Sequence, residues 1–229
     1  MTDKYDRHPS IELNEIFSEH KLPHQGQDPF KSEVVIIGLD ANYSSDISKS
    51  PEFLKIIFEY HQDGVAFWKK YGVHHPFLLS KYPFARNTGG VPYHRKFTWL
   101  GLGFDFSEKI SFLELLPFPT TGRTDSSKFW ELFDINHASK IDDLVYKGDR
   151  RIILLSSSVM KGYMFRAAKR YGVFQWLPTE FAFGEIARIG KTSIVGAPHF
   201  SSTTYKKSVF EKVGSDIREF CQPSRVGHL

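Results

Sequence analysis

The stretch Val34-Val35-Ile36-Ile37-Gly38-Leu39-Asp40-Ala41-Asn42-Tyr43 decides the fold of this chain, because it joins an apolar strand to a polar turn. Four consecutive branched aliphatic residues are typical of a strand buried on both faces. A glycine then ends the strand, and a carboxylate and an amide follow it. Ligands of open α/β sheets bind beyond the carboxyl ends of the strands. The stretch therefore predicts an α/β sheet with a polar site at its edge.

Three later segments repeat this arrangement of an apolar strand followed by polar residues: Ser111 to Thr121, Arg151 to Ser158, and Thr192 to Ser202. Helical patterns separate them, such as the one that begins at Pro51, a favourable residue in the first helical turn. Strands that alternate with helices indicate a sheet covered on both faces. We expect a three-layer α/β/α architecture with a central, mostly parallel four-stranded sheet.

The length of 229 residues fits one domain. Residues 1–31 are mainly polar and are interpreted as an N-terminal arm on the surface, with room for one short helix. Residues 32–222 are predicted to form a single α/β domain, and residues 223–229 a C-terminal tail.

Charge and cysteine content limit the function classes. The chain has 30 Lys and Arg against 26 Asp and Glu, a net charge of +4, which permits a polyanionic partner without requiring one. Cys221 is the single cysteine, so a disulfide framework or a cysteine-based zinc site within this chain is excluded. No apolar run has the length of a membrane span. We expect a cytoplasmic protein that does not enter a membrane.

Taken in order, the polar segments resemble the motifs of the uracil-DNA glycosylase superfamily. The turn quoted above is similar to its first motif. Asn87-Thr88-Gly89-Gly90-Val91-Pro92-Tyr93 resembles a loop of the single-strand-selective monofunctional branch, and Ala197-Pro198-His199-Phe200-Ser201-Ser202 resembles the final motif. Phe112 to Pro117 lies where the family has its base-reading strand. The resemblance covers residues 33 to about 210.

The resemblance implies the uracil-DNA glycosylase fold and a DNA glycosylase that acts in base-excision repair. Such an enzyme flips a damaged, uracil-like base out of DNA and hydrolyses its N-glycosidic bond, with no metal or other cofactor. Extrusion is needed because the target bond is inaccessible inside a duplex. DNA is the implied partner, and we expect a monomer. No lysine at a strand end suggests a Schiff base, so lyase activity is not expected.

By the same resemblance, Asp40 would activate the attacking water, and His199 would donate a hydrogen bond to the departing base. Each has a plainer interpretation, because Asp40 is also suited to capping a turn and His199 to a loop. The implied base pocket contains Gly38, Leu39, Ala41, Asn42, Tyr43, Tyr93 and Glu114.

Tyr93 would stack on the flipped base, a role for which Phe84 and Phe97 are rivals.

A DNA-binding segment is expected near the last helix, where hydroxyls and free N–H groups at a helix start can bind phosphate. It comprises Ser201, Ser202, Lys206 and Lys207, with Tyr205 as a wedge that replaces the flipped nucleotide. An ordinary capped and solvated helix is the plainer interpretation.

Glu114 departs from the family pattern, because it stands where an Asn usually reads the base. An ionised carboxylate only accepts hydrogen bonds and would oppose uracil O4. Glu114 is either protonated and imitates the amide, or selects a base edge with two donors, or pairs with a buried cation. Ala41, Asn42, Phe200 and Ser202 are further departures, which together indicate a divergent branch.

Three other interpretations remain. A catalytically weak or inactive nucleic-acid-binding relative would keep the fold and the basic surface. An unrelated α/β enzyme for a small metabolite is disfavoured, since the chain lacks the P-loop, GxGxxG and GxSxG signatures. The run Ser156-Ser157-Ser158 is typical of a helix N-cap rather than a hydrolase nucleophile. A metal site formed by His74, His75 and His94 is the third, although neighbouring loop histidines rarely share one ion.

Overall fold

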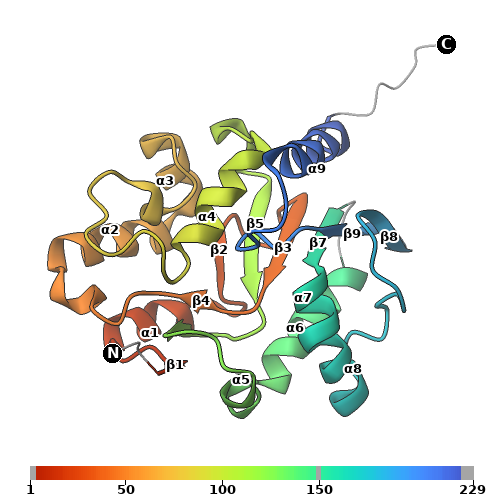
Figure 1. Cartoon of the computed structure of the whole chain (residues 1–229), viewed down its shortest axis with the longest axis horizontal. Helices are drawn as coiled ribbons and strands as arrows, with labels where there is room; N and C mark the ends of the chain where they lie inside the picture. Colours follow the sequence, from red (N-terminus) through yellow and green to blue (C-terminus); the bar gives the residue numbers. More distant parts are fainter. Residues whose placement is uncertain (1–3, 148–150, 223–229) are drawn as a thin grey trace.

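The computed structural model describes residues 4–147 and 151–222. Helices and strands alternate along most of the chain (Figure 1). The strands are β1 (Asp6–Arg7), β2 (His24–Gly26), β3 (Val34–Gly38), β4 (Ala41–Asn42), β5 (Ile110–Glu114), β6 (Pro119–Thr121), β7 (Arg151–Ser156), β8 (Gly184–Ile189) and β9 (Thr192–Ala197). The helices are α1 (Ile11–Ser18), α2 (Pro51–Gln62), α3 (Gly64–Tyr71), α4 (Val91–Phe97), α5 (Ser126–Leu132), α6 (Ile135–Tyr146), α7 (Ser157–Val159), α8 (Phe165–Tyr171) and α9 (Lys207–Phe220).

The central sheet is mixed and six-stranded, in the order β2-β5-β3-β7-β9-β8. The inner strands β5, β3, β7 and β9 are mutually parallel, and each corresponds to one of the four predicted strands. The prediction of a four-stranded sheet is wrong, because β2 and β8 add antiparallel edges. Both edge strands are short or half-exposed, so they lack the apolar run that marks a buried strand.

Alternate side chains of the inner strands enter two different hydrophobic cores. In β3, Val35 and Ile37 pack with residues of α5, α6 and α8, whereas Val34 and Ile36 pack with residues of α3, α4 and α9. Figure 1 shows α5 to α8 on one side of the sheet and α2, α3, α4 and α9 on the other. Burial on both faces explains the uninterrupted apolar sequence of β3 and confirms a layered α/β arrangement.

The segment 1–31 is part of the folded domain rather than a surface arm, as far as it is described. Leu13 and Phe17 of α1 are buried in a third core, beside α2 and the segment after β3. β2 forms an edge of the central sheet, and β1 pairs with β6. The sequence pattern understates this burial because only one narrow side of α1 is apolar. The predicted tail 223–229 lies outside the described residues.

A second, three-stranded sheet in the order β1-β6-β4 lies beyond the ends of β3 and β5. After β3 the chain crosses into β4, and after β5 it crosses into β6, so both connections leave the central sheet together. Backbone hydrogen bonds hold the two crossings side by side, from Leu115 N to Gly38 O (3.1 Å) and from Leu116 N to Leu39 O (3.1 Å). This divergence opens the space in which the candidate site lies.

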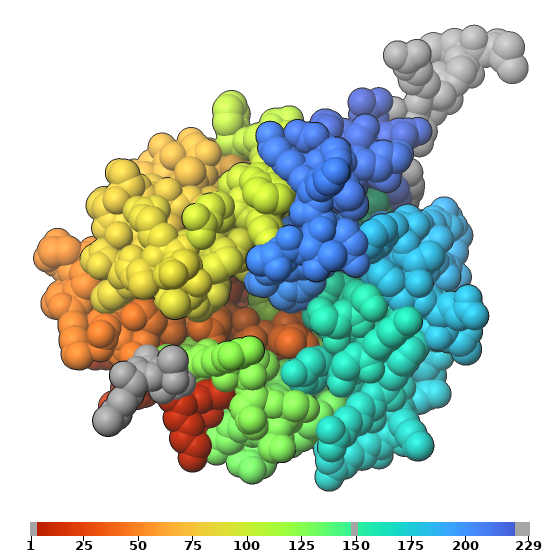
Figure 2. Space-filling model, in the orientation of Figure 1, coloured from red at the N-terminus to blue at the C-terminus, as the bar shows by residue number. Residues whose placement is uncertain are grey.

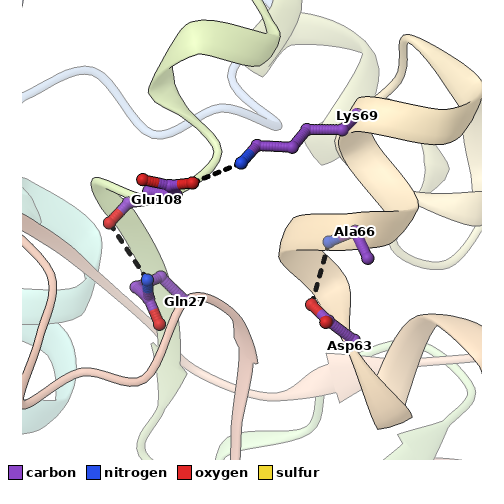
Figure 3. Close-up of polar contacts among 5 residues, drawn as sticks. All are labelled: Gln27, Asp63, Ala66, Lys69 and Glu108. Carbon is purple, nitrogen blue, oxygen red and sulfur yellow. Dashed lines mark hydrogen bonds and ion pairs between the residues drawn. The ribbon is translucent and has the colours of Figure 1, made fainter.

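Edge strand β2 is fixed to the neighbouring elements by several contacts. Gly26 has φ +81°, and Gly64, the first residue of α3, lies so close that an added Cβ would be 2.8 Å from the Gly26 Cα. The Gln27 amide donates to the Glu108 carbonyl (3.2 Å), and the Glu108 side chain also pairs with Lys69 of α3 (Figure 3). These contacts set the position of β2 relative to β5.

The prediction that a helix begins at Pro51 is confirmed by α2. Gly72 and Gly172, at φ +68° and +76°, cap α3 and α8. The last helix begins at Lys207, so Ser201 and Ser202 lie before it. Within the described ranges, no helix combines the length and apolar character needed to cross a membrane.

Candidate active site at the carboxyl ends of β3 and β5

A cavity of about 660 Å³ lies where the chain leaves the central sheet. In Figure 2 the surface is hollowed where the orange-red segment after β3, the yellow-green segment around α4 and the blue segment after β9 meet. The structure brings all of the predicted catalytic and base-pocket residues to its walls, together with Ser201 of the predicted DNA-binding segment: Gly38, Leu39, Asp40, Ala41, Asn42, Tyr43, Tyr93, Glu114, His199 and Ser201.

Asp40 occupies the crossing between β3 and β4. Its Oδ2 accepts a hydrogen bond from the hydroxyl of Thr120, a fully buried residue of β6, at 2.5 Å. The Asn42 amide donates to Thr120 Oγ1 (3.2 Å) and to the Gly122 carbonyl (2.9 Å), which fixes the direction in which the hydroxyl points. Asp40 is thus held by side chains across the small sheet, which a simple turn cap would not require.

The pKa of Asp40 reflects two opposing effects. On balance the pKa of Asp40 is raised, because burial raises it most, and the hydrogen bond from Thr120 with the nearby polar groups of Tyr5 and Asn42 lowers it only in part. The Tyr5 hydroxyl is buried close to this carboxylate, whose charge adds to burial in raising the pKa of the phenol. Charge-assisted hydrogen bonds of this kind favour the ionised carboxylate.

Glu114, the last residue of β5, pairs in register with Gly38 of β3. Its carboxyl lies directly over the Gly38 Cα, since a Cβ added at residue 38 would be 2.1 Å from Glu114 Oε2. Glycine is therefore required at this position for the carboxyl to reach the cavity.

The Glu114 carboxyl has no ion pair and no hydrogen bond within residues 4–147 and 151–222, although its backbone carbonyl accepts one from His137 (2.8 Å). The idea that it pairs with a buried cation is therefore wrong for the described chain. Burial, with the Asp40 charge as a second cause, raises the pKa of Glu114 well above its ordinary value. Such an environment favours the protonated acid, which can donate one hydrogen bond and accept another.

His199 follows β9 and lines the same cavity. Its Nδ1 accepts a hydrogen bond from the Ser201 backbone N–H (3.1 Å), which assigns the proton of the neutral ring to Nε2. Burial lowers the pKa of His199, and the nearby Lys96 charge lowers it further, so the neutral form dominates at neutral pH. The ring can therefore donate from Nε2 without carrying a charge.

Tyr93, in α4, contacts His199 edge-to-face at 5.7 Å between ring centroids and also lines the cavity. Of its two rivals, Phe97 is buried in the core beneath α4, and Phe84 packs against the third core. Neither lines the cavity, whereas Phe77 does. Tyr93 and Phe77 are thus among the aromatic residues that line the cavity, together with Tyr43 and Tyr82.

Of the five predicted DNA-binding residues, Ser201 lines the cavity, and only Lys206 and Lys207 lie at a helix N-terminus. Because α9 begins at Lys207, Ser201 and Ser202 belong to the preceding turn, in which the Ser202 N–H donates to the His199 carbonyl (2.8 Å). Lys206 immediately precedes α9, and Lys207 pairs with Glu211 (3.3 Å). Tyr205 is 36% exposed and contacts the exposed ring of Phe183.

Several cavity residues were not anticipated from the sequence. Gln25, His75, His94 and Arg123 line the walls, and Thr120 orients Asp40 from behind them. The pattern of the chain contains no signal for Gln25, which belongs to a three-residue strand without apolar alternation. His75 follows α3 and His94 lies in α4, and the sequence suggested no role for either beyond a metal site.

His74, His75 and His94 form a packed stack of rings. The rings of His75 and His94 stack at 3.7 Å, and His74 Nε2 lies 3.1 Å from His94 Nδ1. Burial lowers the pKa of all three, which favours neutral rings. Within the part of the chain that is described, no three His, Cys, Asp or Glu side chains are grouped so that they could hold a metal ion.

Ser156 acts as the N-cap of α7, with its hydroxyl accepting from the Val159 N–H (3.4 Å), as the serine run predicts.

A scan against protein-family models and a search of curated proteins found no match to this chain. The interpretation of the site therefore depends on its own geometry.

Proposed function

We propose that this chain is a monofunctional DNA glycosylase, a divergent member of the uracil-DNA glycosylase superfamily with the fold of that family. It would excise a damaged, uracil-like base during base-excision repair. The observation that carries the proposal is the pair of strand-end carboxyls in one cavity. Asp40 is hydrogen-bonded by Thr120, and Glu114 has no partner among the described residues. One group is suited to ionisation and the other to protonation, which is how environments separate two similar acids.

The proposed reaction adds water across the bond between the sugar C1′ and the base nitrogen. The bond electrons leave with the base, positive charge develops on the sugar, and the water oxygen bonds to C1′. The ionised Asp40 stabilises the cationic sugar and orients the water, whose proton is released as the bond forms. The departing base takes up a proton, so that the products are an abasic sugar and the neutral base.

His199 serves the departing base. As negative charge grows on a base carbonyl oxygen, the His199 Nε2–H donates to that oxygen. The hydrogen bond from the Ser201 N–H to Nδ1 keeps the proton on the required nitrogen. A neutral donor is sufficient, because charge-directed hydrogen bonds strengthen in a site from which water is excluded.

The protonated Glu114 replaces the amide that the family uses to read the base. Its O–H donates to a carbonyl such as uracil O4, and its carbonyl accepts from an adjacent ring N–H. Tyr93 would stack on the flipped base. Arg123, which lines the cavity, and the exposed Lys206 would contact the DNA backbone, and the exposed Tyr205 would act as the wedge. A monomeric protein working on DNA inside the cell fits this proposal.

The test is strand cleavage by alkali after incubation with labelled oligonucleotides. They carry uracil, hypoxanthine, xanthine, 5-hydroxymethyluracil or thymine, in single strands and paired. We expect abasic sites with at least one of the first four bases, and a loss of about 10²- to 10⁴-fold in Asp40→Asn. Asp46→Asn, an exposed aspartate that pairs with Lys49, is the matched control and should retain full activity.

Two results would count against this proposal. DNA binding without abasic-site formation on any substrate would favour the catalytically inactive nucleic-acid-binding relative. Equal activity of the Asp40→Asn and native proteins would remove Asp40 from the reaction, whatever base is excised.

A further inference from the structure

Two exposed aromatic rings rest against each other beside the candidate site. Phe183 is 47% exposed and Tyr205 is 36% exposed, and their ring centroids lie 5.3 Å apart in an edge-to-face arrangement. In Figure 2 the light-blue segment before β8 lies against the blue segment after β9. Single exposed rings are normal on a protein surface, but two adjoining rings form a contiguous aromatic surface, which indicates an interaction site.

Tyr205 is held close to the cavity by an ordered turn. Ser201 lines the cavity four residues earlier in the chain, so the Cα atoms of the two residues are at most about 14 Å apart. In this turn the Ser202 N–H donates to the His199 carbonyl (2.8 Å), and the Thr204 N–H donates to the Ser202 hydroxyl (3.2 Å). These bonds fix where Tyr205 follows the turn that carries His199.

Phe183 is held at the same edge of the sheet by the pairing of β8 with β9. Gly184, the first residue of β8, pairs in register with Gly196 of β9, so Phe183 stands beside the carboxyl end of β9. The segment before β8 passes directly over Gly196, where an added Cβ would clash with the Ala182 carbonyl oxygen. Two separate segments therefore bring the two rings to the strand end from which His199 follows.

The charges beside the two rings are arranged unequally. Lys206 directly follows Tyr205, is exposed, and has no ion pair within residues 4–147 and 151–222. On the other segment Glu180 is exposed, and Glu185 pairs with Arg188 (2.6 Å). The unpaired positive charge thus lies on the Tyr205 side. A cation beside accessible aromatic rings suits a nucleic-acid strand, which places a phosphate on the cation and a base on the rings.

The shape of the aromatic pair limits which bases it can contact. The two ring planes meet at 75°, so the pair is not flat. Tyr205 alone has the shape of a wedge, but two rings at this angle cannot enter together between stacked base pairs. A base that has left its stack offers a free face to an aromatic ring. The pair therefore fits an unpaired base.

We propose that Phe183 and Tyr205 form a stacking site for an unpaired base of the DNA strand, at a nucleotide adjacent to the one whose base enters the cavity. This inference rests on the proposed function and adds a second point at which the protein holds the strand. Every base has an aromatic face, so the site holds the strand without selecting its sequence. Lys206 contacts the phosphate nearest to the stacked base.

The experiment measures binding by fluorescence anisotropy, so that it does not depend on catalysis. The probes are single-stranded oligonucleotides with a tetrahydrofuran abasic analogue at the centre. Adenines flank the analogue in the first probe, and the 5′ or the 3′ neighbour is also abasic in the other two. The proteins are the native chain, Phe183→Leu, Tyr205→Phe and the control Phe30→Leu. Phe30 is 50% exposed and precedes the amino end of β3, whereas the cavity lies at its carboxyl end. The salt concentration is the same throughout, because affinity depends on it.

We expect Phe183→Leu to bind the adenine-flanked probe about tenfold more weakly than the native chain does. Tyr205→Phe keeps the ring, and Phe30→Leu is remote, so both should bind like the native chain. Loss of the neighbouring base on one side should weaken native binding by a similar factor. The two losses should not add, so Phe183→Leu and the native chain should bind that probe equally. In a duplex, where the neighbouring base is paired, this coupling should be absent.

Native affinity in Phe183→Leu, or losses that add, would overturn the inference. The same coupling in a duplex would overturn the assignment to an unpaired base. Coupling without excision of any base would support the stacking site and reject the glycosylase, whereas excision without coupling would do the reverse. If the native chain bound none of the probes, both proposals would be overturned, and the aromatic pair would be left to a protein partner.

Discussion

The ends of β3 and β5 carry the same chemical group in opposite surroundings. Asp40 follows β3 and receives the Thr120 hydroxyl, while Glu114 ends β5 with no hydrogen bond or ion pair in the described residues. Burial raises the pKa of both carboxyls. A hydrogen bond to the charged form acts only on Asp40, so the contrast teaches that hydrogen bonding, rather than depth alone, distinguishes the surroundings of the two carboxyls in this cavity.

The contrast depends first on where the Glu114 carboxyl lies, which Gly38→Ala would change. The new Cβ would fall 2.1 Å from Glu114 Oε2, so the carboxyl must leave its position. We expect base excision to fall by about 10²-fold or more, and the free energy of unfolding by about 1–3 kcal/mol. Single-turnover excision and urea unfolding measure the two effects.

Gly162→Ala is the matched control, since a Cβ at that position meets no atom within 4 Å. If Gly38→Ala keeps native excision rates, the position of Glu114 has no importance for the reaction, and the comparison between the two strand ends fails.

Removing the Thr120 hydroxyl, which bonds Asp40 and not Glu114, should make the surroundings of the two carboxyls more similar. Thr120→Val deletes the donor to Asp40 Oδ2 and also leaves the Asn42 amide with one fewer acceptor. The pKa of Asp40 should rise, so the acidic limb of the pH–rate profile moves to higher pH. At neutral pH we expect excision to fall by about tenfold to a hundredfold.

The control for this variant is Thr192→Val, a buried threonine at the start of β9 whose hydroxyl bonds the Val145 carbonyl (3.0 Å). An unshifted acidic limb in Thr120→Val would mean that Asp40 does not depend on this hydrogen bond for its ionisation.

The sequence alone was sufficient to predict the strand end that carries Asp40. The apolar run of β3 and the turn after it mark Asp40 without any structure, because strand burial and strand ends are local properties. All four inner strands were predicted for the same reason. The edge strands were missed, since His24–Gly26 has no apolar pattern and β8 is half-exposed.

The surroundings of Glu114, at the other strand end, became known only from the fold. Glu114 was identified by position, but three roles remained open, because its partners are set by register with Gly38 and by the absence of a cation among the described neighbours. Thr120 and Gln25 contribute through strand pairings between segments that are distant in the chain. Such pairings leave no periodic trace in a single sequence. The start of α9 was misplaced because the serines and threonines before it resemble caps that the helix does not use.

A smaller effect on activity is expected from Glu114→Gln, which keeps a neutral donor and acceptor but cannot ionise. The acid form of Glu114 is present below its raised pKa and is lost as pH rises through that value, so native activity should decline on the alkaline side. We expect Glu114→Gln to excise its base within about tenfold of the native rate, with the alkaline decline reduced. A loss beyond about 10²-fold, at every pH, would show that the carboxylate form is needed.

The last prediction concerns stability alone, where the sign follows from the same raised pKa. The folded chain keeps the Glu114 proton to higher pH than the unfolded chain does, so the folded state binds more protons between the two pKa values. Stability contributed by this group is complete below the ordinary glutamate pKa of about 4.5 and is lost as pH rises through the folded pKa. The decline has a slope of at most about 1.4 kcal/mol per pH unit.

Glu114→Gln removes this titration, so the difference in unfolding free energy between the variant and the native chain should shift in favour of the variant as pH increases from 5 to 8. Urea unfolding at each pH measures that difference, and Asp40 titrates in both proteins, so most of its contribution cancels. A difference that stays constant across this range would mean that Glu114 is ionised in the folded chain at pH 5. In that case the two strand ends would carry two charges, and the base-reading role of a neutral Glu114 would be lost with the contrast on which it depends.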